Sequence, residues 1–311
     1  MHDSVDVVIP AFNVEDVIED TINRIAAQQI PDGWALNIFV TDDASTDATL
    51  SRLRRLQEAH PGLHIVESAT NGGRSIARNR GVAAGKGSIV ILCDADCRFT
   101  RDDTVAEFVA ELLAGADAVI GLIELTGEGF WARYTNSVTA GRVEDDADQG
   151  LMAYTTQNFA IRRDVFEKLS GYSTDYRKYG FEDRDFLIRL ERLTTRVVVR
   201  EDLRVSHDDD FTLRAVCRKA EESGRYSAAV FRDRFPEHYR MLPYARCDAT
   251  RLSIARLIGP LSRPLRWLTE NVAGLALSLR FPGFRITRFL VQVAVCAAYF
   301  RGTHESVALR P

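Results

Sequence analysis

Ile89-Val90-Ile91-Leu92-Cys93-Asp94-Ala95-Asp96 is the stretch that decides how this chain folds, because an apolar run leads directly into two carboxylates. A short, continuous apolar run is typical of a strand that is buried on both faces of a parallel sheet. If the extended conformation persists, Asp94 and Asp96 project to the same side. Ligands of open α/β sheets bind at the carboxyl edge, where such a strand ends. The stretch therefore predicts a ligand site at the end of a central strand.

The two carboxylates of this stretch have two interpretations. Like charges this close repel each other unless a cation or a polyol lies between them, and Mg²⁺ or Mn²⁺ is the usual solution. Aspartate is also a common turn residue, so an isolated Asp-x-Asp is most often a solvated turn. Neighbouring motifs have to decide between the two.

The composition is that of an ordinary globular protein of 311 residues, with 46% hydrophobic and 27% charged residues. The formal net charge of −4 gives no overall footprint for nucleic acid. The charge is uneven, since the chain from Arg251 onward holds nine arginines and two glutamates, a net +7 that leaves −11 for residues 1–250. We expect no nucleic-acid partner and a basic region after an acidic body.

The cysteines and the start of the chain suggest a cytoplasmic protein. Five cysteines, an odd number without a Cys-x-x-Cys pair, favour reduced thiols over a disulfide framework. Met1-His2-Asp3 runs directly into a strand-like segment, which leaves no room for a signal peptide. We expect the protein to stay inside the cell.

Strand-like and helix-like segments alternate through the first half of the chain. This alternation predicts an α/β fold with a mostly parallel sheet and helices on both faces. Asn13 is expected to cap the first helix, and Thr104 with Glu107 fits a capping box ahead of the fourth. The expected strands are 5–10, 36–40, 63–66, 89–92 and 118–123, and the expected second and third helices are 47–59 and 75–84.

A polar cluster follows each of the first four strands, so a parallel sheet would gather all four clusters at one edge. The clusters are Pro10-Ala11-Phe12-Asn13, Thr41-Asp42-Asp43-Ala44-Ser45, Asn71-Gly72-Gly73-Arg74 with Ala77-Arg78-Asn79-Arg80-Gly81, and Asp94-Ala95-Asp96. In this order the motifs resemble those of the inverting glycosyltransferases of family 2, whose nucleotide-sugar-binding fold is called GT-A. The resemblance spans roughly residues 4–210 and is far more specific than any single motif.

The resemblance implies a nucleotide-sugar donor site in the first half of the chain. Asp43, with Asp42 beside it, would read uracil or ribose, and Arg74 or Arg78 would neutralise the diphosphate. Two alternatives stay open: Asp42 and Asp43 also suit a helix N-terminus, and Arg78 also suits a scaffold role between aspartates. The donor-binding residues implied are Pro10, Ala11, Asn13, Asp42, Asp43, Gly73, Arg74, Arg78, Asp94, Ala95 and Asp96.

The second half supplies the implied acceptor side. Thr155-Thr156-Gln157-Asn158-Phe159 resembles the family strand beneath the donor sugar, so Gln157 and Asn158 would contact the acceptor. Asp164 can cap the short helix that follows. In Glu182-Asp183, which opens a helix anchored by Phe186, Leu187, Leu190 and Leu193, the family's general base falls on Asp183, and Glu182 would position the acceptor or the base. Acids at a helix start are also common for electrostatic reasons. Asp185 resembles a scaffold position of the family, and it stays open as a weaker rival for the base.

His207 completes the implied site. It follows the strand-like residues 203–206 at a place where several relatives have a metal-binding histidine, and imidazole accepts Mn²⁺ beside carboxylate. Asp96 and His207 would then hold Mn²⁺ or Mg²⁺, while a lone histidine at a strand end can also be structural. The implied reaction is a single displacement from a UDP-sugar to a hydroxyl of a saccharide or lipid-linked acceptor, in polysaccharide or cell-envelope glycan synthesis.

Beyond residue 210 the chain changes character. Residues 211–235 look helical, and residues 289–300 hold no charge but are shorter than the ~20 residues of a spanning helix. Residues 1–210 therefore form the expected GT-A catalytic domain, and 211–311 a C-terminal helical region that borders the acceptor. The basic stretch 251–311 can lie in the interface of an anionic membrane on the cytoplasmic face of the inner membrane, or pack as a helical subdomain.

Other function classes fit less well. A nicotinamide dehydrogenase needs Gly-x-Gly-x-x-Gly after its first strand, and Pro10-Ala11-Phe12-Asn13 does not supply it. A sugar-phosphate nucleotidyltransferase carries a glycine-rich, basic first loop that is missing here. A non-catalytic carbohydrate-binding or assembly protein of the same fold is the alternative from another class. Against it stand the retained acids Asp43, Asp94, Asp96 and Asp183.

Overall fold

The computed structural model describes residues 3–207, 211–252, 259–279 and 283–308. The chain forms two compact units. The first consists of residues 1–128, 135–174 and 182–209, and the second of residues 129–134, 175–181 and 210–311. The assignment of a catalytic role to residues 1–210 and an acceptor-bordering role to 211–311 stays a prediction.

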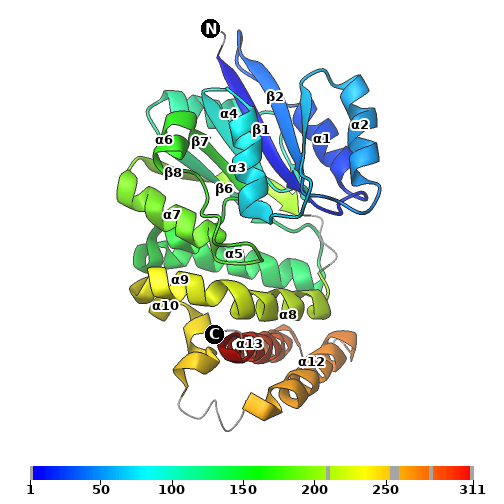
Figure 1. The fold of residues 1–311 in the computed structure, drawn as a ribbon, viewed down its shortest axis with the longest axis vertical. Coiled ribbons are helices and arrows are strands. Elements are labelled where there is room, and N and C mark those ends of the chain that lie inside the picture. Colours follow the sequence, from blue (N-terminus) through cyan, green and yellow to red (C-terminus); the bar gives the residue numbers. More distant parts are fainter. Residues whose placement is uncertain (1–2, 208–210, 253–258, 280–282, 309–311) are drawn as a thin grey trace. The chain divides into compact units, whose positions relative to one another are not determined.

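The first unit is built on a mixed eight-stranded sheet with the order β3-β2-β1-β4-β7-β6-β8-β5 (Figure 1). β1 pairs in parallel with β2 and β4, β2 with β3, and β6 with β8. β7 runs antiparallel to β4 and β6, and β5 antiparallel to β8. The strands are β1 Ser4–Ala11, β2 Ala35–Asp42, β3 Leu63–Glu67, β4 Ile89–Cys93, β5 Cys97–Phe99, β6 Ala118–Glu124, β7 Asn158–Arg162 and β8 Val197–His207.

Helices cover both faces of this sheet, as the alternating pattern predicts. Side chains of β1 alternate between two apolar clusters, with Val7 facing α1, α2 and α4 and Val8 facing α3, α6 and α7. This period of two is what places a core on each face. The helices are α1 Ile18–Ala26, α2 Thr49–Ala59, α3 Arg74–Ala84, α4 Thr104–Leu113, α5 Phe130–Gln149, the 3-10 turn η1 Gly150–Ala153, α6 Arg163–Lys168 and α7 Glu182–Leu193.

Three expected helix caps are wrong. α1 begins at Ile18, because Asn13 adopts a positive φ of 53° and its side chain binds Thr46 instead. Thr104 is the first residue of α4 rather than its cap, and its hydroxyl donates to the Arg101 carbonyl. Asp164 lies inside the first turn of α6 and forms ion pairs with Arg162 and Lys168.

One further expectation is wrong, and one strand was not expected. Leu193 is exposed at the end of α7, whereas Phe186, Leu187 and Leu190 are buried as expected. β5 is a strand that the sequence pattern does not reveal, since it has three residues and depends on pairing with β8.

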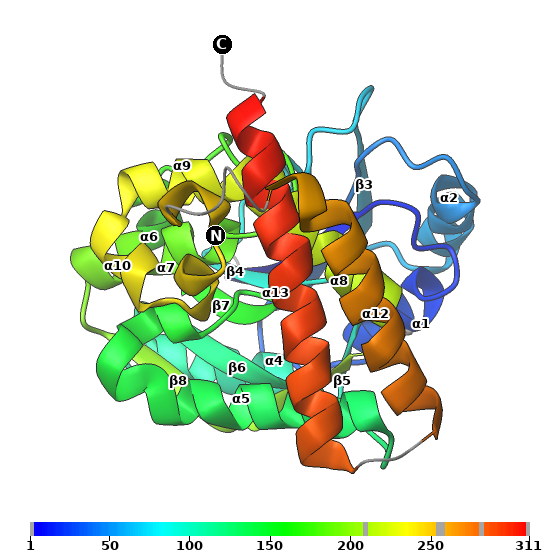
Figure 2. The ribbon, with the colours of Figure 1, turned by 90° about the horizontal axis from the view of Figure 1, so that it is seen from below.

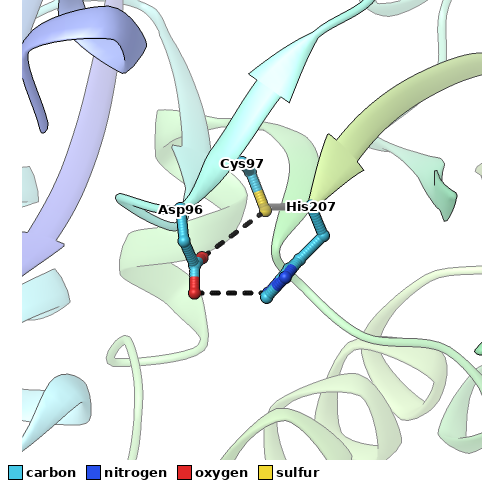
Figure 3. A group of neighbouring side chains, drawn as sticks. All are labelled: Asp96, Cys97 and His207. Carbon is cyan, nitrogen blue, oxygen red and sulfur yellow. Dashed lines mark hydrogen bonds and ion pairs between the residues drawn. The ribbon is translucent and has the colours of Figure 1, made fainter. Parts of the chain in front are cut away.

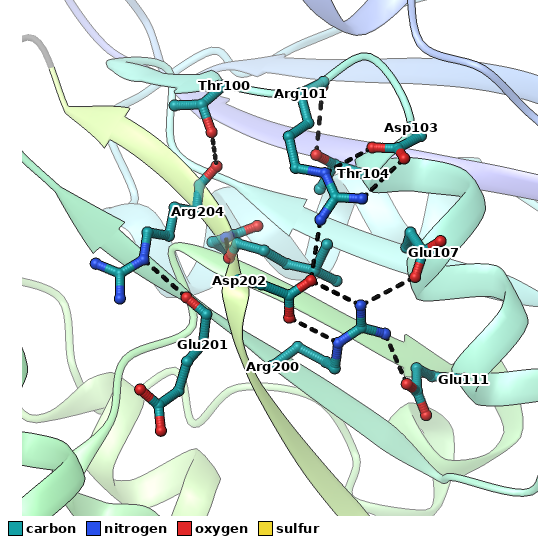
Figure 4. Close-up of polar contacts among 12 residues, drawn as sticks. Thr100, Arg101, Asp103, Thr104, Glu107, Glu111, Arg200, Glu201, Asp202 and Arg204 are labelled. Atoms are coloured by element: carbon teal, nitrogen blue, oxygen red, sulfur yellow. Dashed lines mark hydrogen bonds and ion pairs between the residues drawn. The ribbon is translucent and has the colours of Figure 1, made fainter.

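An ion-pair network ties β8 to α4 (Figure 4). Arg200 donates to Glu107, Glu111 and Asp202, and Asp202 also accepts from Arg101. The Arg200 side chain is 22% exposed and Asp202 is 51% exposed, so water screens this network. We call these residues the Arg200 network.

The second unit is helical (Figure 2). α13 packs against α12 and α8, and Gly302 allows α13 to approach α8 closely. A Cβ at Gly302 would collide with the Glu221 carbonyl. The elements are α8 Leu213–Glu222, the π-helix η2 Ser223–Ser227, α9 Ala228–Arg234, α10 Pro236–Met241, the 3-10 turns η3 Pro243–Arg246, η4 Ala249–Arg251 and η5 Gly259–Leu261, α12 Ser262–Leu279 and α13 Phe284–Ala308.

A disulfide joins Cys247 to Cys296 of α13, with Cα atoms 5.5 Å apart. The expectation of five reduced thiols is therefore wrong for this pair, and cysteine usage no longer argues for a reducing compartment. Cys93, Cys97 and Cys217 are free and buried. Within the described residues, every helix is too short or too polar to cross a bilayer.

Candidate active site

The topology of the sheet brings the predicted motifs to one edge. β1, β2 and β4 are parallel, so the residues after them meet at their carboxyl ends. β8 runs in the same direction, because β7 reverses the chain between β4 and β6 and β6 is parallel to β8. β7 itself begins at this edge, since it runs the other way. Residues at these five strand ends, together with Arg78 of α3 and Asp183 of α7, form the candidate site.

Asp43 organises the loop in front of α3. Its carboxylate accepts the backbone N–H of Gly72 at 2.9 and 3.1 Å and that of Gly73 at 2.8 Å. Gly73 has φ of 86°, which favours glycine at the turn into the helix. A carboxylate has about four lone-pair positions, so Asp43 can hold this loop and still accept one hydrogen bond from a ligand. The buried Asp42 accepts from Ser45 N.

Arg78 lies at the centre of the site and is fully buried. Its guanidinium donates to Asp94 at 2.7 Å and to Asp183 at 2.9 Å, and it lies over the Tyr172 ring, 5.1 Å from the centroid. Burial, the largest single influence, would raise the pKa of Asp94. The charges of Arg78 and Arg74 and the hydrogen bonds from Arg78 and Gln157 together outweigh it and hold that pKa well below its usual value. The geometry thus favours the scaffold interpretation of Arg78. We call Arg78, Asp94 and Asp183 with their polar partners the Arg78 network.

A chain of hydroxyl groups also fixes Asp183, and sequence reasoning missed it. The Tyr172 hydroxyl donates to Thr156 Oγ1 at 2.6 Å, and Thr156 donates to Asp183 Oδ1 at 2.6 Å. Arg78 binds the same oxygen of Asp183. Among the described residues Oδ2 has no such partner, and the Asp183 side chain is 16% exposed. Thr156 and Tyr172 lie in segments that the sequence marks, but the contact depends on tertiary packing.

Glu182 is buried beside Asp183 and is paired with Arg74 at 3.7 Å. Burial, and then the charge of Asp183, raise the pKa of the Glu182 carboxyl above its usual value. Arg74 is the first residue of α3 and more than a third of its side chain is exposed. A cation at the open edge of the site can meet a phosphate, whereas the buried Arg78 cannot.

Asp96 and His207 lie side by side, as the metal-site prediction requires (Figure 3). His207 Nε2 is 3.3 Å from Asp96 Oδ2. Cys97 adds a third candidate ligand atom for a metal ion, its Sγ, which lies 3.9 Å from Asp96 Oδ1. One donor atom from each residue lies within 4.8 Å of the others, a set that could hold a metal ion. Carboxylate, imidazole and thiol donors all fit a divalent transition metal.

The pattern of the family-2 glycosyltransferases matches residues 6–170, more than half of the chain, under the description "Glycosyl transferase family 2". The chain belongs to glycosyl transferase family 2. A second pattern, described as the N-terminal domain of galactosyltransferase, matches residues 149–208. Together the two matches include the donor-side motifs, the start of β7, Asp183 and His207.

Relatives of this family 2 chain include a putative teichuronic acid biosynthesis glycosyltransferase, TuaG, from Bacillus subtilis, 31% identical over 34% of this chain and 42% of the relative. Glycosyltransferase AglE from Haloferax volcanii is 27% identical over 54% of this chain and 55% of the relative. The family 2 chain thus spans about half the length of these two curated relatives.

Solved structures confirm the predicted GT-A fold. The mannosyltransferase PcManGT from Pyrobaculum calidifontis, in complex with GDP-Man and Mn²⁺, superposes with a TM-score of 0.65 and 24% identity, covering 96% of this chain and 86% of the neighbour. S. aureus TarS 1–349 in complex with UDP gives a TM-score of 0.56 and 16% identity, covering 98% and 91%.

The geometry of the family 2 chain separates the predicted site residues. Gln157 donates to Asp94 Oδ2 at 2.9 Å and so belongs to the Arg78 network. Asn158 is buried, and its amide donates to the carbonyls of Leu122 and Leu203 within the sheet. These bonds support the sheet and argue against contact with the acceptor, and the acceptor role of Asn158 stays a prediction. The buried, ion-paired Asp185 has the expected scaffold position.

The small donor-side residues supply backbone rather than side-chain groups. Ala95 is buried in the turn after β4, and its carbonyl accepts the Thr21 hydroxyl at 2.7 Å. The carbonyl of Ala11 accepts the N–H of Asp43, which links the ends of β1 and β2. Asn13 is exposed, and Pro10 is partly exposed at the end of β1. Contact of Pro10, Ala11, Asn13 and Ala95 with a donor stays a prediction.

Proposed function

We propose that this family 2 chain is an inverting glycosyltransferase that moves a sugar from a nucleotide-sugar donor, a UDP-sugar, to a hydroxyl of a saccharide or lipid-linked acceptor. The observation that carries the proposal is the Arg78 network. One buried guanidinium binds both Asp94, in the donor-side motif, and Asp183, at the start of α7. A single site can then hold a donor and a general base at a fixed separation.

Asp183 is the proposed base. Thr156 and Arg78 hold Oδ1, which orients the carboxylate and leaves Oδ2 for the acceptor. In the reaction the acceptor oxygen forms a bond to the anomeric carbon while its proton passes to Asp183. The bond from that carbon to the diphosphate oxygen breaks, and its electron pair leaves with the nucleotide. In-line attack converts an α-linked donor into a β-linked product.

The donor side uses the remaining residues of the edge. Asp43 and Asp42 would meet the uracil and ribose, and the exposed Arg74 would bind the diphosphate. Asp96 and His207 would hold Mn²⁺ or Mg²⁺, whose charge would stabilise the leaving diphosphate. Neighbouring folds bind GDP-Man with Mn²⁺ in PcManGT and UDP-GlcNAc in TarS, which supports a nucleotide-sugar donor and a divalent ion.

The names of the relatives suggest where such an enzyme works. They include a teichuronic acid biosynthesis glycosyltransferase, a poly(ribitol-phosphate) beta-glucosyltransferase and a dodecaprenyl-phosphate galacturonate synthase. We propose a role in polysaccharide or cell-envelope glycan synthesis, on the cytoplasmic face of the membrane. The relatives are matched over only part of their length, so the acceptor of this chain has to be identified by experiment.

The experiment is a screen of nucleotide sugars with Mn²⁺ for binding and for release of the nucleotide. Wild-type protein should release UDP from one donor. Asp183→Asn should bind that donor with unchanged affinity, but its rate of UDP release should be at least about 100-fold lower, within the usual range for general-base catalysis. Asp164→Asn, an exposed acid outside the site, is the matched control. Binding without release in the wild type would favour the non-catalytic carbohydrate-binding alternative.

We also propose that the second unit binds an anionic lipid surface. An apolar stripe lies on the exposed face of α12 and includes Leu261, the residue before the helix. The buried residues of this helix are small: Ser262, Ala273 and Ala276. The stripe has spacings of three and four residues, and Trp267 is 67% exposed nearby. Exposed Arg263 and Arg285 supply positive charge. The stripe consists of Leu261, Leu265, Leu268, Val272, Leu275 and Leu279.

Vesicle sedimentation tests the lipid surface. The full chain should sediment with vesicles rich in phosphatidylglycerol and not with pure phosphatidylcholine vesicles, because cationic and apolar side chains act together. Leu268→Glu with Leu275→Glu should abolish sedimentation. Leu113→Glu, an equally exposed leucine on α4, is the control. If the wild type does not sediment with vesicles but forms a dimer, and the double variant is a monomer, the stripe binds a second copy of the chain instead.

A further inference from the structure

Cys97 lies where a third metal ligand would lie. It is the direct partner of His207 in the antiparallel pairing of β5 with β8. Directly opposite residues of such a pair project their side chains from the same face of the sheet. Asp96 precedes Cys97 in the turn, and its carboxylate is 3.9 Å from the sulfur and 3.3 Å from the imidazole. The pairing register, and not sequence proximity alone, brings the three donors together (Figure 3).

From this geometry we propose that Cys97 is a protein ligand that makes the site selective for thiophilic divalent ions, Zn²⁺, Co²⁺ or Cd²⁺, over Mg²⁺. Thiolate favours softer ions, whereas Mg²⁺ is bound by oxygen. Metal–ligand bonds of 2.0–2.3 Å give tetrahedral edges of about 3.5 Å, and the Asp96 carboxylate is 3.3 Å from the His207 imidazole and 3.9 Å from the Cys97 sulfur. Three protein donors leave a fourth position open, as in catalytic zinc sites.

Binding has a defined proton balance. The Cys97 sulfur forms the metal bond as a thiolate, so its proton passes to the solvent when the ion enters. No oxidant or reductant takes part. Because Mg²⁺ gains little from sulfur, Cys97 should matter for Co²⁺ and Cd²⁺ and hardly at all for Mg²⁺.

The inference rests on the metal site of the proposed function but is tested without turnover. Cobalt(II) bound to a cysteine sulfur gives a charge-transfer band in the near ultraviolet. The intact chain, titrated with Co²⁺ in the absence of any sugar nucleotide, should show this band. Cys97→Ser should lose it, whereas Cys93→Ser, which removes a neighbouring buried thiol, should keep it.

Calorimetry gives the second reading. Cys97→Ser should weaken Cd²⁺ binding at least about tenfold and change Mg²⁺ binding less than about twofold. A wild-type protein without the cobalt band, or a Cys97→Ser variant that keeps it, would overturn the proposal, and the wild-type titration decides even if the variant misfolds. A protein that shows the cobalt band but never releases nucleotide would contradict the proposed function and leave this inference intact.

Discussion

The Arg78 and Arg200 networks contain the same chemistry in different surroundings. In each, a central arginine binds acids that include two from distant segments, with hydrogen bonds of 2.7–3.0 Å. The Arg78 side chain has no exposure, whereas that of Arg200 is 22% exposed and Asp202 is half exposed. Arg200 binds more carboxylates than Arg78 does. The comparison teaches that burial, not the number of ion pairs, sets the cost of losing an arginine.

The largest effect should follow Arg78→Met. Removal of the guanidinium leaves Asp94 and Asp183 without their buried counter-charge, which costs about 3–5 kcal/mol in the free energy of unfolding. Urea unfolding of the wild type and the variant measures this loss, and nucleotide release should disappear with it. A stability loss equal to that of the matched Arg200→Met variant would contradict the comparison.

A smaller effect should follow Thr156→Val, which removes the hydroxyl between Tyr172 and Asp183. The loss of a hydrogen bond to a charged group costs about 1.5–3 kcal/mol, and a misoriented base should lower kcat more than it raises KM. Thr156→Ser should restore both stability and kcat, because it keeps the hydroxyl. If the serine variant is as slow as the valine variant, the hydroxyl chain has no part in orienting Asp183.

A pH-dependent effect sharpens the role of burial. The pKa of Glu182 is raised in the folded state, so the unfolded chain loses this proton at lower pH than the folded chain does. Its contribution to stability is complete below the usual glutamate pKa of about 4.5 and is lost as pH rises through the folded value. Unfolding of wild type and Glu182→Gln between pH 4.5 and 8 should show the wild type losing stability relative to the variant. A gain in the stability of the wild type relative to the variant over this pH range would contradict a raised pKa of Glu182 in the folded state.

The smallest effect should follow Arg200→Met. Exposed ion pairs contribute about 0–1 kcal/mol each and salt screens them. We expect a loss near 1 kcal/mol at low ionic strength that shrinks in 0.5 M NaCl, with nucleotide release unchanged. Chemical denaturation at two salt concentrations measures it, and a salt-independent loss would mean that water screens this network less than its exposure implies.

The sequence was sufficient for the central strands of the sheet and for its edge, because apolar runs and polar clusters are local patterns. Ile89–Cys93 forms a strand that ends at Asp94, and the clusters after β1, β2 and β4 share one edge, as predicted. Helix caps failed where a loop residue bound another loop, as Asn13 binds Thr46. A cap competes with tertiary partners that no local pattern records.

Long-range partners account for most of what the sequence left open. Whether Arg78 meets phosphate or carboxylate depends on Asp183, which lies 105 residues away. The same holds for Cys97, which comes to lie beside Asp96 and His207 through pairing of β5 with β8. It holds also for Asn158, whose amide binds two carbonyls of neighbouring strands. The disulfide between Cys247 and Cys296 spans 49 residues and leaves no local signature.

The most direct test of the central claim, that one site holds a donor in line with the base Asp183, uses water as the acceptor. Slow hydrolysis of an α-linked UDP-sugar with Mn²⁺ is followed by proton NMR before the free sugar mutarotates. The account predicts that the β anomer appears first with wild-type protein and that Asp183→Asn releases no sugar above background. An α anomer that appears first, or unchanged release by Asp183→Asn, would contradict it.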